Sequence, residues 1–165
     1  MKSIIFDLDL TLVDSTIAES ARKARDWQLV YSLIPRFSVY EGLENVFDII
    51  RKHTIKVCIV STAPRIYVEK VVNYFHIPYH YIIGFHDAKP IKPNPAPMFK
   101  AVELMNETTN NVISFGDRVI DIQASNSANI ESVACFWGTK EKRELILSKY
   151  RHAIINPNEI ITLIR

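Results

Sequence analysis

The chain has 165 residues, of which 48% are hydrophobic and 23% charged, a composition typical of one globular domain with a full apolar core. Its formal net charge is only +2, so no nucleic-acid partner is expected. No run of the sequence approaches the roughly 20 apolar residues that span a bilayer, and the apolar stretch near the N-terminus is too short for a signal peptide. We therefore expect a cytoplasmic protein without a membrane segment.

Short apolar runs alternate with helical patterns along most of the chain. The runs are rich in Ile, Val, Phe and Tyr, as strands buried on both faces are. They predict strands over Ser3–Asp7, Lys56–Ser61, Tyr79–Gly84, Val112–Gly116, Ser132–Trp137 and Ala153–Ile155. The intervening segments predict helices over about Thr16–Leu33, Leu43–Lys52, Arg65–Tyr74, Ala96–Met105, Val119–Ala128, Lys140–Ser148 and Asn158–Leu163. This alternation predicts an α/β fold, a doubly wound Rossmann-like parallel sheet with helices on both faces.

Residues 14–40 interrupt the alternation, because they hold a helical pattern but no obvious strand. They could form a small helical cap inserted over the sheet after the first strand, or an ordinary crossover helix with a long return loop. We expect a single domain over residues 1–165 with a reduced cap at 14–40. Arg22, Lys23 and Arg25 give this segment a basic side, which could attract an anionic substrate or could simply face solvent.

Polar side chains follow the predicted strands at the sheet edge where ligands of open parallel sheets bind. They supply what a magnesium-assisted phosphoryl transfer needs: carboxylates for a hard cation, a carboxylate that can attack phosphorus, a second carboxyl group for acid/base work, and a hydroxyl and a lysine for the phosphoryl oxygens. These residues are Asp7, Asp9, Ser61, Thr62, Lys92, Asp117 and Asp121.

Each piece alone has a plainer interpretation. An Asp-x-Asp pair is common in turns, a serine such as Ser61 often caps a helix, and a lysine such as Lys92 is usually solvated. Asp7, Asp9 and Thr11 also match the start of a calcium-binding loop. That alternative fails, because Leu12 stands where such a loop requires glycine and Ala18 where it requires glutamate.

Four motifs in this order resemble those of the haloacid dehalogenase superfamily, in its phosphoglycolate-phosphatase-like branch, and the resemblance covers nearly the whole chain. The motifs are Asp7-Leu8-Asp9-Leu10-Thr11-Leu12-Val13-Asp14-Ser15, Ile59-Val60-Ser61-Thr62, Lys92-Pro93-Asn94-Pro95 followed by Met98-Phe99, and Gly116-Asp117-Arg118-Val119-Ile120-Asp121-Ile122. Trp137-Gly138 after the fifth predicted strand is also similar to that branch.

The resemblance implies a Mg²⁺-dependent phosphatase acting on a phosphorylated substrate. Asp7 would be the nucleophile and a metal ligand, and Asp9 the acid/base, with its backbone carbonyl on the metal. Ser61 and the Thr62 amide would bind the phosphoryl group, and Lys92 would steady both Asp7 and the phosphate. Asp117 would bind the metal, and Asp121 would lie behind the direct ligands.

Three positions depart from the family pattern. Leu10 stands where the family usually has glycine, Asn129 replaces the glycine of a usual Ala-Gly pair, and the cap region is short. Asn is the next most tolerant residue for a left-handed conformation. A phosphotransferase or mutase with the same intermediate, and a non-catalytic phosphate- or partner-binding protein, stay open as alternatives. The natural substrate and the oligomeric state are not readable from the sequence.

Overall fold

The structure is a computed structural model that describes residues 1–165. Six parallel strands form one sheet in the order β5-β4-β1-β6-β7-β8. The strands are β1 (Ser3–Phe6), β4 (Val57–Val60), β5 (Tyr81–Ile83), β6 (Val112–Gly116), β7 (Glu131–Cys135) and β8 (His152–Ile154). The chain runs outward from β1 through β4 to β5, then returns to the other side of β1 for β6, β7 and β8. The predicted doubly wound parallel sheet is therefore confirmed.

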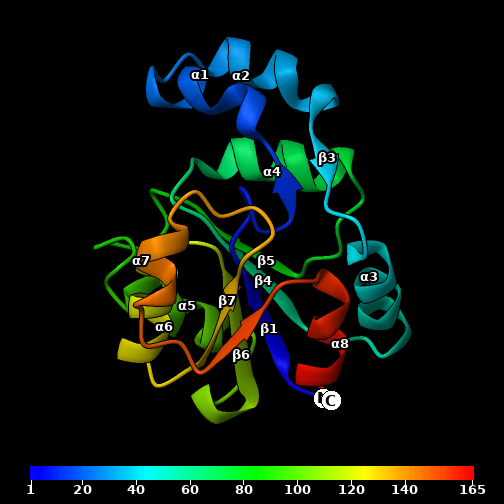
Figure 1. Ribbon diagram of the computed structural model, residues 1–165, viewed down its shortest axis with the longest axis vertical. Helices are drawn as coiled ribbons and strands as arrows, with labels where there is room; N and C mark the ends of the chain where they lie inside the picture. The colour runs from blue at the N-terminus through cyan, green and yellow to red at the C-terminus, as the bar shows by residue number, and fades with distance from the viewer.

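Alternate residues of each strand enter two separate apolar layers, as the two-residue period of a strand requires. In β1, Ile4 and Phe6 pack in the layer beneath α3, α4 and α8, whereas Ile5 packs against α5 and α6. Figure 1 shows α3 and α8 on one side of the sheet and α5, α6 and α7 on the other. The helices are α3 (Leu43–Lys52), α4 (Arg65–Tyr74), α5 (Ala96–Leu104), α6 (Val119–Ser127), α7 (Lys142–Ile146) and α8 (Ile160–Leu163). The last is preceded by a 3-10 turn, η4 (Pro157–Glu159), and another, η3 (Thr109–Asn111), precedes β6.

The first predicted helix is wrong in its extent. The expected single helix over Thr16–Leu33 is a 3-10 turn η1 (Thr16–Ala18), then α1 (Glu19–Lys23) and α2 (Trp27–Leu33), followed by a second 3-10 turn η2 (Ile34–Arg36). Arg25 breaks the helix because its backbone is left-handed, with φ 57°. Asp26 then starts α2 by accepting a hydrogen bond from the Leu29 amide, 3.1 Å away.

Two short strands that the sequence pattern did not indicate stand at the ends of residues 14–40. β2 (Val13–Asp14) and β3 (Ser38–Val39) pair antiparallel, so the chain enters and leaves the helical segment side by side. The segment lies at the top of Figure 1 over α4, as a cap would. We refer to residues 14–40 as the cap, and their role as an inserted unit over the sheet stays a prediction. The strands escaped prediction because two residues are too few to show an alternating pattern.

Five helices end in the same way, with a left-handed residue two positions after the last helical one. At the end of α3, the Ile55 amide donates to the Ile50 carbonyl and the Thr54 amide to the Arg51 carbonyl, the two bonds of a Schellman motif. The left-handed residues are Arg25, Thr54, His76, Asn106 and Asn129. None is glycine, although the motif favours glycine. The expected left-handed conformation of Asn129 is confirmed, with φ 55°.

The structure contains no helix that is both long and apolar enough to cross a membrane.

Candidate active site

The predicted polar residues lie in the segments that follow β1, β4, β5 and β6, at the edge where the strand order changes direction. Neighbouring parallel strands bring their carboxyl ends together, so residues far apart in sequence meet. Gly116, the last residue of β6, allows one of these meetings. A Cβ atom there would lie 2.4 Å from the Cβ atom of Asp121, so any larger residue would displace that carboxylate.

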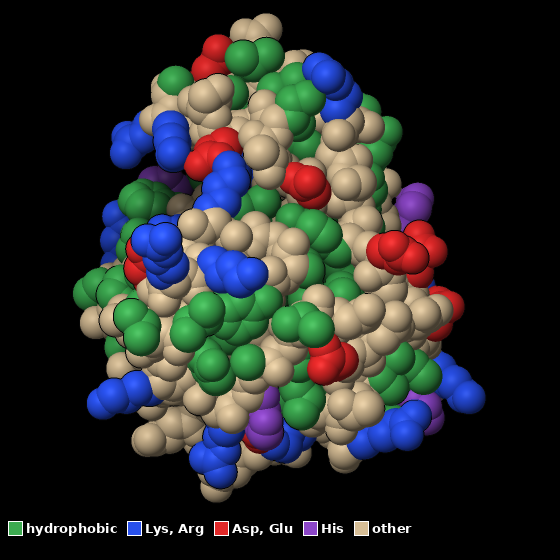
Figure 2. All heavy atoms as spheres, in the orientation of Figure 1, with side chains coloured by type: hydrophobic (Ala, Val, Ile, Leu, Met, Phe, Trp, Pro, Cys, Tyr) green, Lys and Arg blue, Asp and Glu red, His purple; other side chains and the backbone are tan.

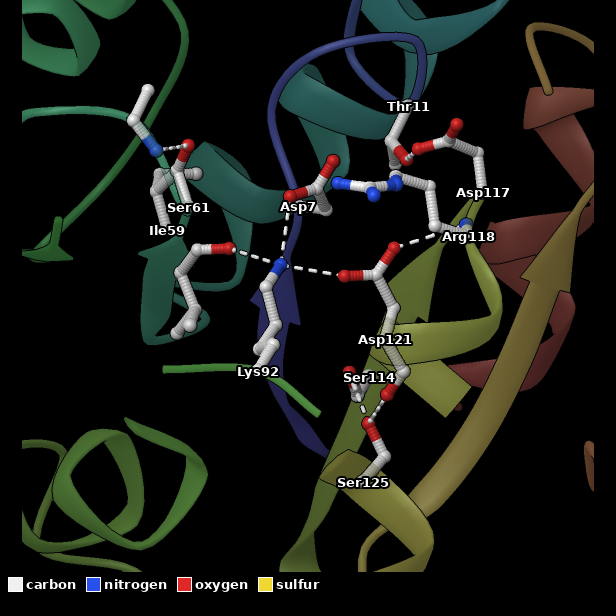
Figure 3. A network of polar contacts seen from close by, with 12 residues as sticks. Asp7, Thr11, Ile59, Ser61, Lys92, Ser114, Asp117, Arg118, Asp121 and Ser125 are labelled. Atoms are coloured by element: carbon white, nitrogen blue, oxygen red, sulfur yellow. Dashed lines mark hydrogen bonds and ion pairs between the residues drawn. The ribbon is translucent and has the colours of Figure 1, made fainter. Parts of the chain in front are cut away.

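Lys92 connects two of the carboxylates. Its Nζ atom donates to Asp7 Oδ1 at 2.8 Å, to Asp121 Oδ1 at 2.5 Å and to the Val60 carbonyl at 2.9 Å. Figure 3 shows this amine between the two carboxylates. Lys92 is only 5% exposed, so three acceptors satisfy all three donors of a buried ammonium group. The interpretation of Lys92 as a solvated surface residue is therefore excluded.

Both carboxylate oxygens of Asp121 accept a hydrogen bond. Oδ2 accepts a hydrogen bond from the Arg118 amide at 3.0 Å, at the start of α6, while Oδ1 accepts from Lys92. A carboxylate at a helix N-terminus is favourably placed relative to the helix dipole. Asp121 therefore fixes Lys92 in place.

Asp117 has one carboxylate oxygen without a partner. Thr11 Oγ1 donates to Asp117 Oδ1 at 3.0 Å, whereas Oδ2 is buried and accepts no hydrogen bond. Carboxylate oxygens of Asp7, Asp117 and Asp121 all lie within 4.8 Å of one another. A buried carboxylate oxygen without a donor is costly, and a cation bound beside it would remove that cost. The residues therefore fit a hard, oxygen-preferring cation such as Mg²⁺.

The pKa values at this edge indicate a shortage of positive charge. Burial, only partly opposed by Lys92, raises the pKa of Asp7 to about 6. Burial, together with the charges of Asp7 and Asp121, raises the pKa of Asp117 to about 9. Burial alone would lower the pKa of Lys92, but the Asp121 and Asp7 carboxylates outweigh it and raise the pKa, so the amine stays charged. A divalent cation would supply the missing charge.

Ser61 and Thr62 lie across the cleft from the carboxylates, at the end of β4. The Ser61 hydroxyl accepts a hydrogen bond from the Ala63 amide at 3.1 Å, which shapes the turn into α4. Both residues line a cleft of about 580 Å³ together with Asp7, Asp9 and Asp117. Three carboxylates, Ser61 and Thr62 therefore line one volume, which is large enough for a small molecule.

A profile of haloacid dehalogenase-like hydrolases matches residues 25–135, about two thirds of the chain. The chain belongs to this family. The matched part of this haloacid dehalogenase-like hydrolase includes Ser61, Lys92, Asp117 and Asp121, while Asp7 and Asp9 precede it.

Curated relatives match part of the hydrolase at modest identity. A putative pyrophosphatase PpaX of Caldanaerobacter subterraneus is 27% identical over 101 residues, covering 60% of this chain and 46% of that protein. A phosphoglycolate phosphatase of Psychrobacter arcticus is 24% identical over 101 residues, covering 60% of this chain and 44% of the relative. The chain therefore spans about half the length of the curated relatives it matches.

Solved structures confirm the fold over the whole chain. A putative phosphoglycolate phosphatase from Lactobacillus plantarum superposes with a TM-score of 0.86 at 20% identity, covering 98% of each chain. A predicted phosphoglycolate phosphatase from Haemophilus somnus superposes with a TM-score of 0.85 at 18% identity, covering 100% of this chain and 98% of the other. The hydrolase thus shares the fold of these proteins over nearly the whole of its chain.

The Trp137-Gly138 pair of the hydrolase closes the loop after β1. The Trp137 indole donates to the Thr11 carbonyl at 2.9 Å. A Cβ atom on Gly138 would lie 2.2 Å from the Leu10 carbonyl oxygen, so only glycine allows this approach. Leu10 itself is left-handed, with φ 64°, although the family usually has glycine there. The loop that carries Asp9 and Thr11 is therefore held by the two residues that follow β7.

The sequence pattern missed the residues that surround Asp9. Its Oδ1 atom accepts hydrogen bonds from Ser15 at 2.5 Å, Arg22 at 2.6 Å and Tyr67 at 2.5 Å. The interpretation of Arg22 as part of a solvated face is wrong, since its guanidinium pairs with Asp9. Tyr67 gave no signal, because it occupies an ordinary core position of an amphipathic helix.

The cap contributes a basic wall to the cleft. Arg22, Lys23 and Arg25 line it, facing Arg118 and Lys140 of the main body. In Figure 2, Lys and Arg side chains gather on the left, where the cap meets the body. Most of these cations are paired, since Lys23 and Lys140 both contact Glu19 and Arg118 contacts Glu141. Arg25 is exposed and has no ion pair, so it is free to meet an anion.

Proposed function

We propose that this protein is a Mg²⁺-dependent phosphatase that hydrolyses phosphate monoesters through an aspartyl-phosphate intermediate. The observation that carries the proposal is the buried group of Asp7, Lys92 and Asp117 at one strand edge, with a carboxylate oxygen of Asp117 left unpartnered. Family membership and relatives named as phosphatases support it. The single domain over residues 1–165, with its reduced cap at 14–40, is part of the proposal.

The reaction has two steps that use the same residues. A carboxylate oxygen of Asp7 forms a bond to phosphorus while the bond from phosphorus to the leaving oxygen breaks, and Asp9 gives that oxygen a proton. Water then attacks phosphorus, Asp9 takes a proton from it, and the bond from phosphorus to Asp7 breaks, releasing inorganic phosphate. Atoms, charge and protons balance, so Asp7 and Asp9 return to their starting states.

The remaining polar residues hold the phosphoryl group during both steps. Ser61, the Thr62 amide and Lys92 donate to its non-bridging oxygens, where charge redistributes in the transition state. Asp7, Asp117 and the backbone carbonyl of Asp9 would hold Mg²⁺, with Asp121 behind them. When bound there, the cation supplies the positive charge that these carboxylates and the phosphoryl oxygens require.

The cleft and the relatives suggest the substrate class. A cleft of about 580 Å³ suits a small or medium-sized ligand. A putative pyrophosphatase and a phosphoglycolate phosphatase are among the relatives, and both names imply a substrate that carries a second anionic group besides the phosphoryl group that is removed. Since Arg25 is unpaired on the cap wall, we infer a substrate that carries a second anionic group.

Hydrolysis of p-nitrophenyl phosphate, with and without Mg²⁺, tests the proposal. We expect turnover that requires Mg²⁺, is lost in EDTA, and is inhibited by Ca²⁺, which takes more ligands and can bind a carboxylate through both oxygens. Asp7→Asn should abolish turnover while its far-UV circular dichroism stays unchanged, because an amide cannot form the acyl phosphate. Full turnover in excess chelator, or near-normal turnover by Asp7→Asn, would refute this mechanism.

The same assay separates the alternatives. A phosphate-binding protein without catalytic activity would bind the ester and release no p-nitrophenol. A phosphotransferase or mutase would pass the phosphoryl group to an added alcohol or sugar phosphate faster than to water. Release of one inorganic phosphate per p-nitrophenol, unaffected by such acceptors, would favour the hydrolase.

A further inference from the structure

Only one carboxylate oxygen of Asp9 accepts hydrogen bonds from the protein. Oδ1 accepts from Ser15, Arg22 and Tyr67, while Oδ2 accepts no hydrogen bond from the protein. Asp9 lines the cleft, and its side chain is 19% exposed. The carboxylate is therefore fixed in orientation by three donors on Oδ1, and Oδ2 is the oxygen that remains available to a ligand.

The donors to Oδ1 come from separate parts of the molecule. Tyr67 lies on α4 of the main body and is completely buried, whereas Arg22 lies on α1 of the cap. The two also contact each other, because Arg22 Nη1 donates to the Tyr67 hydroxyl at 3.2 Å. Trp27 of α2 packs on the Tyr67 ring, with 5.8 Å between the ring centroids. The position of the Asp9 side chain thus depends on how the cap sits on α4.

We propose that Tyr67 and Arg22 are positioning residues for Asp9. Through Arg22, the docked cap orients the Asp9 carboxyl group for proton transfer to the leaving group. They hold Oδ1 so that Oδ2 carries the proton between Asp9 and the leaving oxygen. This rests on the proposed function, since it assigns residues that act through Asp9. A purely structural role for Arg22 and Tyr67, as a tie between cap and body, would instead affect all substrates alike.

Leaving groups of different quality separate these two roles. A phenyl phosphate needs a proton on its leaving oxygen, whereas 2,4-dinitrophenyl phosphate releases a stable anion without one. The ratio kcat/KM reports the step in which Asp7 is phosphorylated, so it isolates proton donation by Asp9. We expect Tyr67→Phe and Arg22→Met to lower kcat/KM for phenyl phosphate roughly 10- to 100-fold, part of the 10²–10⁴-fold that acid/base catalysis contributes. For 2,4-dinitrophenyl phosphate, kcat/KM should change by no more than about threefold, because its leaving group needs no proton.

Three comparisons tie the effect to Asp9. Arg22→Lys should retain most of the activity towards phenyl phosphate, because it keeps a charged donor. In an Asp9→Asn background, Tyr67→Phe should cause little further loss, because residues that act as a unit are not additive. The matched controls Tyr74→Phe, an exposed tyrosine on the same helix, and Arg36→Met, an exposed arginine of the cap, should behave as the wild type.

Equal losses on both esters, or a full additional loss in the Asp9→Asn background, would overturn the positioning role. Unchanged kinetics in Tyr67→Phe and Arg22→Met would overturn it as well. If the wild-type protein hydrolyses neither ester, the proposed function fails, and this assignment fails with it. An active wild type with uniform losses in the variants would reject the positioning role alone.

Discussion

Single buried carboxylates set the response of the metal-free protein to pH. The pKa of Asp117 is raised to about 9 in the folded protein, from an ordinary value of 3.8, so the folded state holds a proton that the unfolded state has lost. Folding stability therefore falls as pH rises towards 9. Asp7, with a pKa of about 6, is mostly deprotonated in the folded protein by pH 7. Asp117 therefore dominates the pH dependence of stability above pH 7.

We predict that the metal-free protein loses about 1 kcal/mol of unfolding free energy per pH unit between about pH 7 and 9. Asp117→Asn should flatten this slope and raise the melting temperature at pH 8, because the buried charge is removed. Millimolar Mg²⁺ should stabilise the wild type and leave Asp117→Asn unchanged. Thermal melts in EDTA and in Mg²⁺ measure both effects, and a wild-type slope retained in Asp117→Asn would contradict the assignment.

Arg25 allows a second prediction for a single residue. Arg25→Glu should raise KM roughly tenfold for substrates with a second anionic group, about the effect of losing one charged hydrogen bond. It should leave KM for p-nitrophenyl phosphate nearly unchanged, since nitrophenol carries no such group. Steady-state kinetics on both kinds of substrate test this, with Arg36→Glu as the control for a charge reversal elsewhere on the cap. Parallel changes on both substrates would mean that Arg25 contacts no second anion.

Five helices end in a left-handed residue that is not glycine, and each of these residues lowers the stability of the folded chain. Thr54 is the least suited of the left-handed residues, because it is β-branched, has φ 51° and is exposed without a side-chain hydrogen bond. A left-handed conformation costs an ordinary L-residue roughly 1–2 kcal/mol, which glycine avoids. Part of the stability gained by a substitution to glycine is offset by the greater freedom of glycine in the unfolded chain.

We predict that Thr54→Gly stabilises the protein by about 1 kcal/mol, which raises the melting temperature by about 2–4 °C in a chain of this size. Lys52→Gly, two residues earlier and still inside α3, should destabilise by about the same amount, because its backbone is helical. Asn129→Gly should have a smaller effect than Thr54→Gly, since Asn tolerates the left-handed region. Thermal or denaturant unfolding compares the three, and a destabilised Thr54→Gly would contradict the argument.

At the scale of the whole molecule, the cap has no core of its own. Its buried side chains, Ala18, Ala21, Val30, Ile34 and Phe37, belong to the same apolar cluster as the sheet and α3. α2 and η2 pack directly on α4. A segment that buries its apolar surface only against the main body loses that burial when it detaches. Cap and sheet should therefore unfold together.

We predict one cooperative unfolding transition. The chain has two tryptophans, Trp27 in the cap and Trp137 after β7, so Trp27→Phe and Trp137→Phe each leave one reporter. Within each variant, the fluorescence midpoint in urea should coincide with the midpoint from far-UV circular dichroism. An earlier fluorescence midpoint in Trp137→Phe, where Trp27 reports alone, would show that the cap unfolds by itself and that 1–165 is not one cooperative domain.

Much of the fold follows from local pattern. The buried strands, the exact bounds of α3 and α4, and the left-handed Asn129 were predictable, because strands with both faces buried and strongly amphipathic helices leave a signal in adjacent residues. The polar residues at the strand ends were also predictable as a group, since parallel strands bring their carboxyl ends to one edge. The break at Arg25 and the two-residue strands β2 and β3 were not, because they depend on how the cap packs.

The sequence by itself determined the α/β class and supplied the set of candidate residues from Asp7 to Asp121. Only the tertiary structure decided that Asp117 keeps a buried oxygen without a partner, that Lys92 bridges Asp7 and Asp121, and that Tyr67 and Arg22 hold Asp9. The physical reason is one of distance along the chain. Periodicity and motifs report on neighbours in sequence, whereas hydrogen bonds between residues as far apart as Asp9 and Tyr67 exist only after the sheet and the cap have packed.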